Sequence, residues 1–301
     1  MKMMNRTTTW SNIGVEAKGQ NLDNLLSAAD LDYTVILSDL FTEVGGQKIL
    51  VPNKKVTMRE DTNQVFGVVS DRYQICQNRD ALDFVNYIEN IELLKAGSYA
   101  NGGGYSYLIS QLPEVKVLGD EIRPHLIFQT SHDGSSSVKA TICMLRIACQ
   151  NQFVHAFKDS PATIKITHSG NMGEKLQTAQ ATMLQVHDYV QHFEQQAEYL
   201  AGKKITPQTF NRVLERFFVT NPEWSDRWNQ KVEEQKDYFI QAYNADDNQN
   251  FKGTRWGLVN AYADFITHDE PIRKTNNWED SKFFGSLNSA PMDQFLEYVT
   301  I

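Results

Sequence analysis

The stretch LIFQTSHDGSSSVKATICML, residues 126–145, holds two runs of apolar and β-branched residues on either side of a polar turn. Such runs are typical of β-strands. Asp133-Gly134 lies between them, and Asp-Gly is a preferred pair for a tight hairpin turn, in which both central residues need positive φ. The stretch therefore predicts an antiparallel hairpin. We interpret His132 and Asp133 as parts of this turn, with His132 solvated or capping at its mouth, rather than as catalytic or metal-binding residues.

The same strand pattern recurs through the first half of the chain, with one helix among the strands. After Asn78, which is expected to cap the helix, residues 79–91 place apolar side chains on one helical face. β-branched and aromatic runs predict strands at residues 32–40, 54–60, 64–73, 92–100, 104–112, 122–130, 137–149 and 162–168.

From Asn171 the pattern becomes helical. Asn171 and Glu174 have the spacing of a capping box, and an apolar heptad seam follows over residues 176–200. This seam packs either inside the same chain or against a second copy, which would make a homo-oligomer. Thr206-Pro207 and Asn221-Pro222 are each expected to open a further helix.

These patterns together predict an α+β protein: a twisted, mostly antiparallel sheet with a packed helix, followed by a helical C-terminal half. We expect an α+β core domain over residues 1–171. The helical region, residues 172–301, is expected to pack on that core or to form a second lobe.

Composition fits a folded cytoplasmic protein. The chain has 301 residues, of which 41% are hydrophobic, and it begins without the apolar run of a signal peptide. No stretch has the length of a membrane span, so we expect no membrane partner. Cys76, Cys143 and Cys149 lack metal-site spacing and are expected to be reduced structural thiols.

A net charge of −8 argues against a uniformly basic nucleic-acid coat. A local basic face remains compatible with it, because Lys48, Lys54, Lys55 and Arg59 follow one another with no acid between them.

Enzymatic chemistry has little support in the sequence. A nucleophilic pair of Cys149 with His155 or His168 is the strongest catalytic candidate, and we give it low weight because nothing indicates proximity. Asp246-Asp247 lacks the spacing of a calcium loop. We therefore predict no catalytic residue, no metal site and no cofactor, and regard an enzyme as the less favoured class.

Several separated motifs carry a family resemblance. GVVSDRYQICQN, GSYANGGGYSY, SHDGSSS with RIACQN, HSGN, TRWGLVNAYADF and FFG occur in that order. The chain resembles the phage/plasmid-like protein family, also called domain of unknown function 932, from about residue 10 to residue 287. The resemblance implies a role in mobile-element biology, close to recombination, replication or host takeover, and carries no catalytic mechanism with it.

The motifs also contain candidate nucleic-acid contacts. A glycine run lets a backbone approach phosphates, and tyrosines beside it can stack on bases, although tyrosines alternating along a strand are more often half-buried sheet residues. The candidate contacts are Lys48, Lys54, Lys55, Arg59, Arg72, Tyr73, Tyr99, Gly102, Gly103, Gly104, Tyr105, Tyr107 and Arg123.

Two further motif residues have an internal interpretation that we favour. Arg146, inside an apolar strand, is expected to pair with an acid such as Asp71 rather than to bind an anion. His168-Ser169-Gly170-Asn171 is expected to cap a helix rather than to hold an anion at its N-terminus.

The sequence thus predicts a mobile-element accessory protein that binds or anneals single-stranded DNA in recombination or replication. An acidic protein that binds a host protein, and a cryptic enzyme, are the alternatives. The acidic helical half, with 8 Lys/Arg against 12 Asp/Glu over residues 172–250, suits the first alternative.

Overall fold

The structure is a computed structural model, and it describes residues 13–17, 19–99, 103–146, 151–155, 162–183, 186–269, 283 and 287–300. Two residues named above, Gly102 and Cys149, lie outside these ranges.

The larger of two sheets has eight strands, all paired antiparallel. Its main order is β1-β5-β6-β8-β9-β10, with β7 beside β8 and β11 beside β9. The strands are β1 (Val15–Glu16), β5 (Glu92–Tyr99), β6 (Tyr105–Gln111), β7 (Val115–Val117), β8 (Asp120–Ser131), β9 (Val138–Arg146), β10 (Asn151–Phe153) and β11 (Thr163–Ile166).

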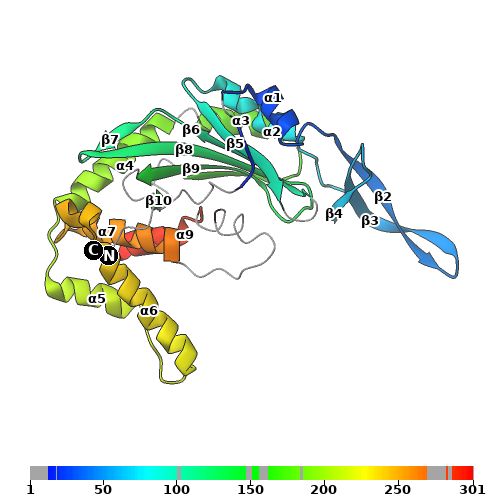
Figure 1. Cartoon of the computed structure of the whole chain (residues 1–301). Coiled ribbons are helices and arrows are strands. Elements are labelled where there is room, and N and C mark those ends of the chain that lie inside the picture. Colours follow the sequence, from blue (N-terminus) through cyan, green and yellow to red (C-terminus); the bar gives the residue numbers. More distant parts are fainter. Residues whose placement is uncertain are drawn as a thin grey trace.

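The smaller sheet, called the arm, consists of β2 (Val35–Val44), β3 (Gln47–Arg59) and β4 (Val65–Ser70). β4 pairs only with Lys54–Met58 of β3, so the hairpin of β2 and β3 continues beyond it as two strands. Figure 1 shows this hairpin projecting from the body of the molecule.

Helices lie on both sides of the larger sheet: α1, α2 and α3 on one side, α7 and α9 on the other (Figure 1). The helical elements are α1 (Leu22–Ala28), α2 (Asn78–Leu82), the 3-10 helix Asp83–Tyr87, α3 (Met172–Met183), α4 (Val186–Ala201), α5 (Pro207–Phe217), α6 (Asp226–Tyr243), the 3-10 helix Asp246–Phe251, α7 (Arg255–Asp264), the π-helix Phe265–Asp269 and α9 (Ala290–Thr300).

The apolar alternation of the sequence explains the core. Phe128 and Leu126 of β8, with Ile142 of β9, are buried on one face of the sheet. On the other side α7 is buried all round, against β10 and α4, where Trp256 meets Phe193 edge to face. The predicted α+β class, with antiparallel sheets first and helices afterwards, is confirmed. No helix in the described ranges has the length and apolar character needed to cross a membrane.

Two predicted helix starts are wrong. Asn78 is the first residue of α2, not its cap, because its side chain is buried and bonded elsewhere; the helix ends at Leu82 and continues only as a 3-10 turn. α6 begins at Asp226 with Ser225 as its N-cap, because Asn221 instead exchanges hydrogen bonds with Asn229. Thr206 caps α5 as predicted.

The heptad seam is divided between α3 and α4. On α4, Val186, Phe193, Ala197 and Leu200 are buried within the chain itself. That part of the seam is therefore already covered and does not face a second copy.

Candidate nucleic-acid interface

A row of side chains crosses four strands on one face of the larger sheet. The antiparallel register places Tyr107 opposite Gln129, Gln129 opposite Lys139, and Lys139 opposite Lys165. Directly opposite residues project from the same face of a sheet. Strands β6, β8, β9 and β11 therefore present these four side chains together.

Two more tyrosines lie in the neighbouring row of the same sheet face. Tyr99 and Tyr105 are opposite each other on β5 and β6, with ring centroids 5.0 Å apart, and Tyr99 lies 6.0 Å from Tyr107. Tyr99 and Tyr105 are half-buried, whereas Tyr107 is 1% exposed. The rings of Tyr99 and Tyr105 are thus the accessible ones, and we call Tyr99, Tyr105, Lys139 and Lys165 the tyrosine–lysine face.

The two lysines of this face form a like-charge pair. Burial and, secondly, the charge of Lys165 hold the pKa of Lys139 below its usual value. In the described part of the chain neither ammonium group has a carboxylate partner. Like charges directly opposite in a sheet are destabilising, so the pair is a site where an anion would be favourable.

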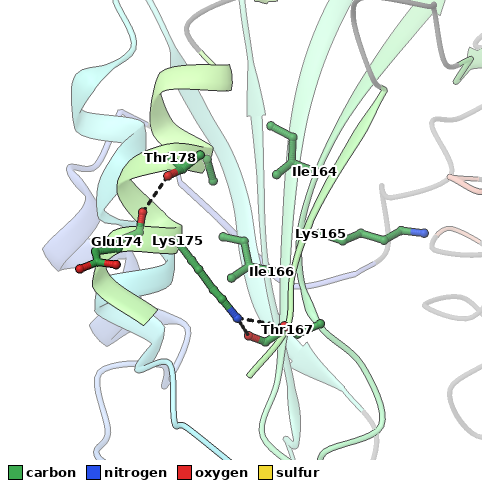
Figure 2. A pocket seen from close by; sticks show the side chains of 8 residues that line it. Ile164, Lys165, Ile166, Thr167, Glu174, Lys175 and Thr178 are labelled. Atoms are coloured by element: carbon green, nitrogen blue, oxygen red, sulfur yellow. Dashed lines mark hydrogen bonds between the residues drawn. The ribbon is translucent and has the colours of Figure 1, made fainter. Parts of the chain in front are cut away.

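Lys165 projects from the face of β11 that points away from α3 (Figure 2). Ile164 and Ile166 are directed toward α3, and Lys165 points to the other side of the strand (Figure 2). The space between β11 and α3 is a groove of about 410 Å³, floored by Ile164, Ile166 and Ala179. Lys165 therefore belongs to the sheet face opposite to α3.

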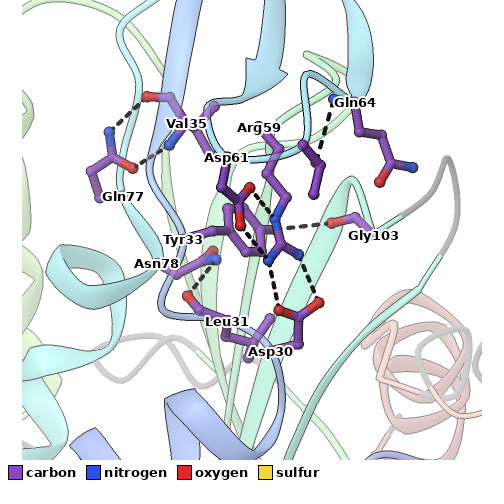
Figure 3. Close-up of polar contacts among 11 residues, drawn as sticks. Asp30, Leu31, Tyr33, Val35, Arg59, Asp61, Gln64, Gln77, Asn78 and Gly103 are labelled. Atoms are coloured by element: carbon purple, nitrogen blue, oxygen red, sulfur yellow. Dashed lines mark hydrogen bonds and ion pairs between the residues drawn. The ribbon is translucent and has the colours of Figure 1, made fainter.

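Arg59, a predicted contact, is neutralised inside the chain. Its guanidinium pairs with Asp30 at 2.6 and 2.7 Å and with Asp61 at 2.7 and 2.9 Å, and it lies 4.2 Å from the centroid of the Tyr33 ring (Figure 3). These hydrogen bonds raise its pKa and lower the pKa values of both carboxyl groups. Arg59 holds the base of the arm, and four of its five N–H donors are used by the two carboxylates, so its charge is already compensated.

The remaining predicted cations are scattered. Lys55 pairs with Asp39, and Arg123 pairs with Glu114 far along β8 from the glycine turn, both at 2.5 Å. Lys48 lies opposite Glu43 on the arm. Lys54 and Arg72 are exposed and have no ion pair within the described ranges. The chain thus brings no continuous basic groove together from these residues.

Gly103 and Gly104, the described residues of the glycine run, are part of the packed structure. The Gly103 carbonyl accepts the Tyr33 hydroxyl at 3.3 Å, and the Gly104 carbonyl accepts the His132 amide at 2.7 Å. These bonds favour the structural interpretation of the turn over a phosphate cradle.

Tyr73 and two histidines of the motifs lie in a buried polar cluster. The Tyr73 hydroxyl donates to the Ser131 carbonyl at 2.8 Å, and its ring stacks on His168 with centroids 4.8 Å apart. His132 is fully buried, and its Nε2 is 2.8 Å from Oδ1 of Asn78. Tyr73 is therefore not accessible to a base, and the prediction of a solvated or capping His132 is wrong.

Burial explains the charge state of this cluster. It lowers the pKa of His132 to about 4 and shifts the pKa of His168 in the same direction. Both imidazoles are neutral at neutral pH, so the cluster is a packed junction rather than a charged site.

The turn between β8 and β9 differs from the predicted tight hairpin. It spans residues 132–137, and Gly134 has φ +77 whereas Asp133 is not in the positive-φ region. Oδ1 of Asp133 instead accepts hydrogen bonds from Ser131 and from the amide and hydroxyl of Ser135. The arm packs directly on this turn, since a Cβ at Gly67 would lie 2.7 Å from the Asp133 carbonyl oxygen.

Arg146 forms ion pairs inside the chain, as the favoured interpretation predicts, but its partners are acids other than Asp71. Its guanidinium bonds Asp120 at 2.5 Å and Asp247 at 3.4 Å, whereas Asp71 is exposed. The predicted Asp71 partner is wrong, because Asp247 reaches the strand from the helical half. This pair joins the sheet to the C-terminal region.

The remaining catalytic candidates are engaged in structural contacts. His155 pairs with Asp293, and Nδ1 of His168 bonds the Gln74 carbonyl at 3.1 Å. No group of three potential metal ligands occurs among the described residues. The Asn171 side chain caps α3 by accepting the Glu174 amide at 3.3 Å, as the capping interpretation predicts.

Comparison with known proteins identifies a family. A family model described as "Domain of unknown function (DUF932)" matches residues 65–284, which include the arm strand β4, the whole tyrosine–lysine face and α7. Comparisons with curated proteins and with solved structures gave no match. The chain therefore belongs to the DUF932 family.

Proposed function

We propose that this protein binds single-stranded DNA through the tyrosine–lysine face and acts in recombination or replication of a mobile element. The observation that carries the proposal is the pair Lys139–Lys165, two cations without a carboxylate partner in the described structure, on the same sheet face as the half-buried rings of Tyr99 and Tyr105.

The chemistry of the face suits a single strand. Lysine ammonium groups bind phosphates without reading sequence. Tyrosine rings stack on bases, and such stacking contributes about 1–3 kcal/mol per base in single-strand binders. Tyr99 and Tyr105 lie on β5 and β6, and β8 separates these strands from β9 and β11, which carry the cations. One strand of DNA would therefore cross β8 to meet rings and cations on the same sheet face.

Fluorescence anisotropy with a labelled thymidine oligonucleotide across a salt series tests the proposal. Counterion release predicts that log K falls linearly with log salt, with a slope of about −0.7 per neutralised phosphate for a single strand. Absence of binding at about 50 mM salt would reject the proposal.

Binding of a host protein is the second proposed function, and it is supported by another surface. Trp224 and Trp228 are exposed at the start of α6, next to Glu223 and Asp226. Exposed tryptophans are common anchors of protein interfaces. Stoichiometric capture of one host protein by the wild type, lost in Trp228→Ala, is the expected result if this alternative holds; no capture would reject it.

A further inference from the structure

Strand β11 lies at the border of the larger sheet. It pairs with β9 through one edge, and no strand in the described ranges pairs with its other edge. The Ile142 amide donates to the Ala162 carbonyl at 2.8 Å, which fixes the pattern of the ladder. Because bonded and non-bonded pairs alternate in an antiparallel ladder, the backbone groups of Thr163 and Lys165 are directed away from β9. The outer edge of β11 thus presents backbone donors and acceptors that have no partner among the described residues.

This edge lies beside the groove between β11 and α3. Ile164 and Ile166 are directed into the groove, whose volume of about 410 Å³ is in the range of ligand-binding clefts (Figure 2). Just past the strand, the Thr167 carbonyl already accepts the Lys175 ammonium at 3.2 Å, so the open row of backbone groups ends there. An open sheet edge beside an apolar groove is the arrangement that binds an extended peptide as an added strand.

The other face of the same edge is cationic. Lys165 and its opposite neighbour Lys139 project there, and neither ammonium group has a carboxylate partner within the described residues. Glu174, at the rim of the groove, lies on the α3 side, away from Lys165 (Figure 2). Successive side chains of an added strand would point alternately into the groove and toward the two lysines. Charge complementarity therefore favours a partner in which apolar and acidic residues alternate.

We infer that β11 and this groove bind an extended acidic peptide segment of a partner protein as an additional antiparallel strand. Peptide residues opposite Thr163 and Lys165 exchange main-chain hydrogen bonds with them and direct carboxylates toward Lys165 and Lys139. Peptide residues opposite Ile164 and Ile166 insert apolar side chains into the groove. The groove lies on the sheet face opposite to the tyrosine–lysine face, so the inference does not rest on DNA binding.

Fluorescence anisotropy of the full chain with a labelled octapeptide of alternating valine and glutamate tests the inference without DNA. In the inferred register the glutamate amides face β11 and the valine amides face away from it. N-methylation of the glutamates removes the main-chain bonds and should weaken binding at least about tenfold. N-methylation of the valines is the matched control and should leave the affinity nearly unchanged. Absence of binding by the parent peptide, or equal losses for the two N-methylated peptides, overturns the inference.

The order of side chains in the peptide gives a second test. A peptide of the same composition, with its valines in one block and its glutamates in another, cannot separate apolar and acidic side chains onto two faces. It should bind at least about tenfold more weakly than the alternating peptide. Equal affinities of the two peptides would show that charge alone attracts them, and would overturn strand addition.

Substitutions in the groove and on the edge complete the test. Ala179→Phe fills the groove from α3, so it should abolish most peptide binding and leave oligonucleotide binding unchanged. Thr163→Pro removes an outward N–H without removing a bond to β9, and should weaken peptide binding. Thr163→Val is its control, since it keeps the N–H and loses only the hydroxyl contact with Thr141. Thermal unfolding checks that each variant is folded. Wild-type peptide affinity in folded Ala179→Phe would contradict the groove as the site.

Discussion

His132 donates its Nε2–H to Oδ1 of Asn78 across 2.8 Å, while Nδ2 of the same asparagine donates to the Leu31 carbonyl at 3.0 Å. One buried amide thus joins three segments: the β8–β9 turn, the start of α2 and the chain that enters the arm. The charge of His132 and the integrity of this amide are therefore expected to control stability.

Acid should destabilise the protein through its buried histidines. Burial lowers the pKa values of His132 and His125 to about 4, below the unfolded value, so the unfolded chain takes up protons first as the pH falls. The contribution of each neutral histidine to the free energy of unfolding is fully present above about pH 6.5 and is lost progressively as the pH falls to about 4. For His132 this loss is on the order of 3 kcal/mol. Urea unfolding across this range measures the loss. In His132→Asn the loss should be smaller, and an unchanged profile would contradict the assignment.

Removal of the Asn78 side chain should destabilise the fold. Asn78→Ala leaves the Leu31 carbonyl and a buried imidazole nitrogen without their partner, at a cost of about 1–3 kcal/mol for each group. Chemical denaturation gives the difference from the wild type. Asn86→Ala is the control, since Asn86 is exposed and should change stability by less than about 0.5 kcal/mol. Equal effects of the two substitutions would argue against the junction.

The lysine pair should limit stability while it promotes binding. Lys165→Gln removes a like-charge neighbour of Lys139, so the free energy of unfolding should rise, by about 0.2–1 kcal/mol. The double variant Lys139→Gln/Lys165→Gln should bind the oligonucleotide more weakly, with a salt slope shallower by about 1.4 if each lysine contacts one phosphate. Lys252→Gln, exposed in the helical half, should change neither quantity. A double variant with the wild-type slope would remove this pair from the interface.

Tyr105 should contribute through its ring rather than its hydroxyl. Tyr105→Phe keeps the stacking surface and loses only the contact with the Ser135 hydroxyl, so affinity for the oligonucleotide should be nearly unchanged. Tyr105→Ala should lower affinity by about 1–3 kcal/mol for a stacked base. Titrations by anisotropy compare the two. Similar losses in both variants would indicate that the hydroxyl, and not stacking, matters.

Local patterns predicted the elements well. The β-branched runs at residues 122–130 and 162–168 correspond to β8 and β11, and Thr206-Pro207 opens α5. These features depend on neighbours in sequence, and so a single sequence contains them. The predicted helix start at Asn221-Pro222 is wrong because Ser225, four residues after Asn221, is an equally good N-cap. Local propensity does not distinguish between the two residues.

Long-range placement explains what the sequence did not predict. Lys139 and Lys165 each alternate with apolar residues on a strand, and this alternation predicts which face of the strand each lysine occupies. It does not predict that the two lysines are neighbours, because that depends on the register of β9 with β11. Arg146 meets Asp247, 101 residues away, and His132 meets Asn78, 54 residues away. Such contacts depend on how whole helices and strands pack together. Residue spacing and composition do not contain that information.

The close approach at Gly67 has a mechanical consequence. The backbone of Gly67 lies against the backbone of Asp133, and on either side of this contact Phe66 packs on His132 and Val69 lies against Gly134. We therefore expect a displacement of the arm to act first on the Asp133 turn, and through it on β9, the strand that carries Lys139.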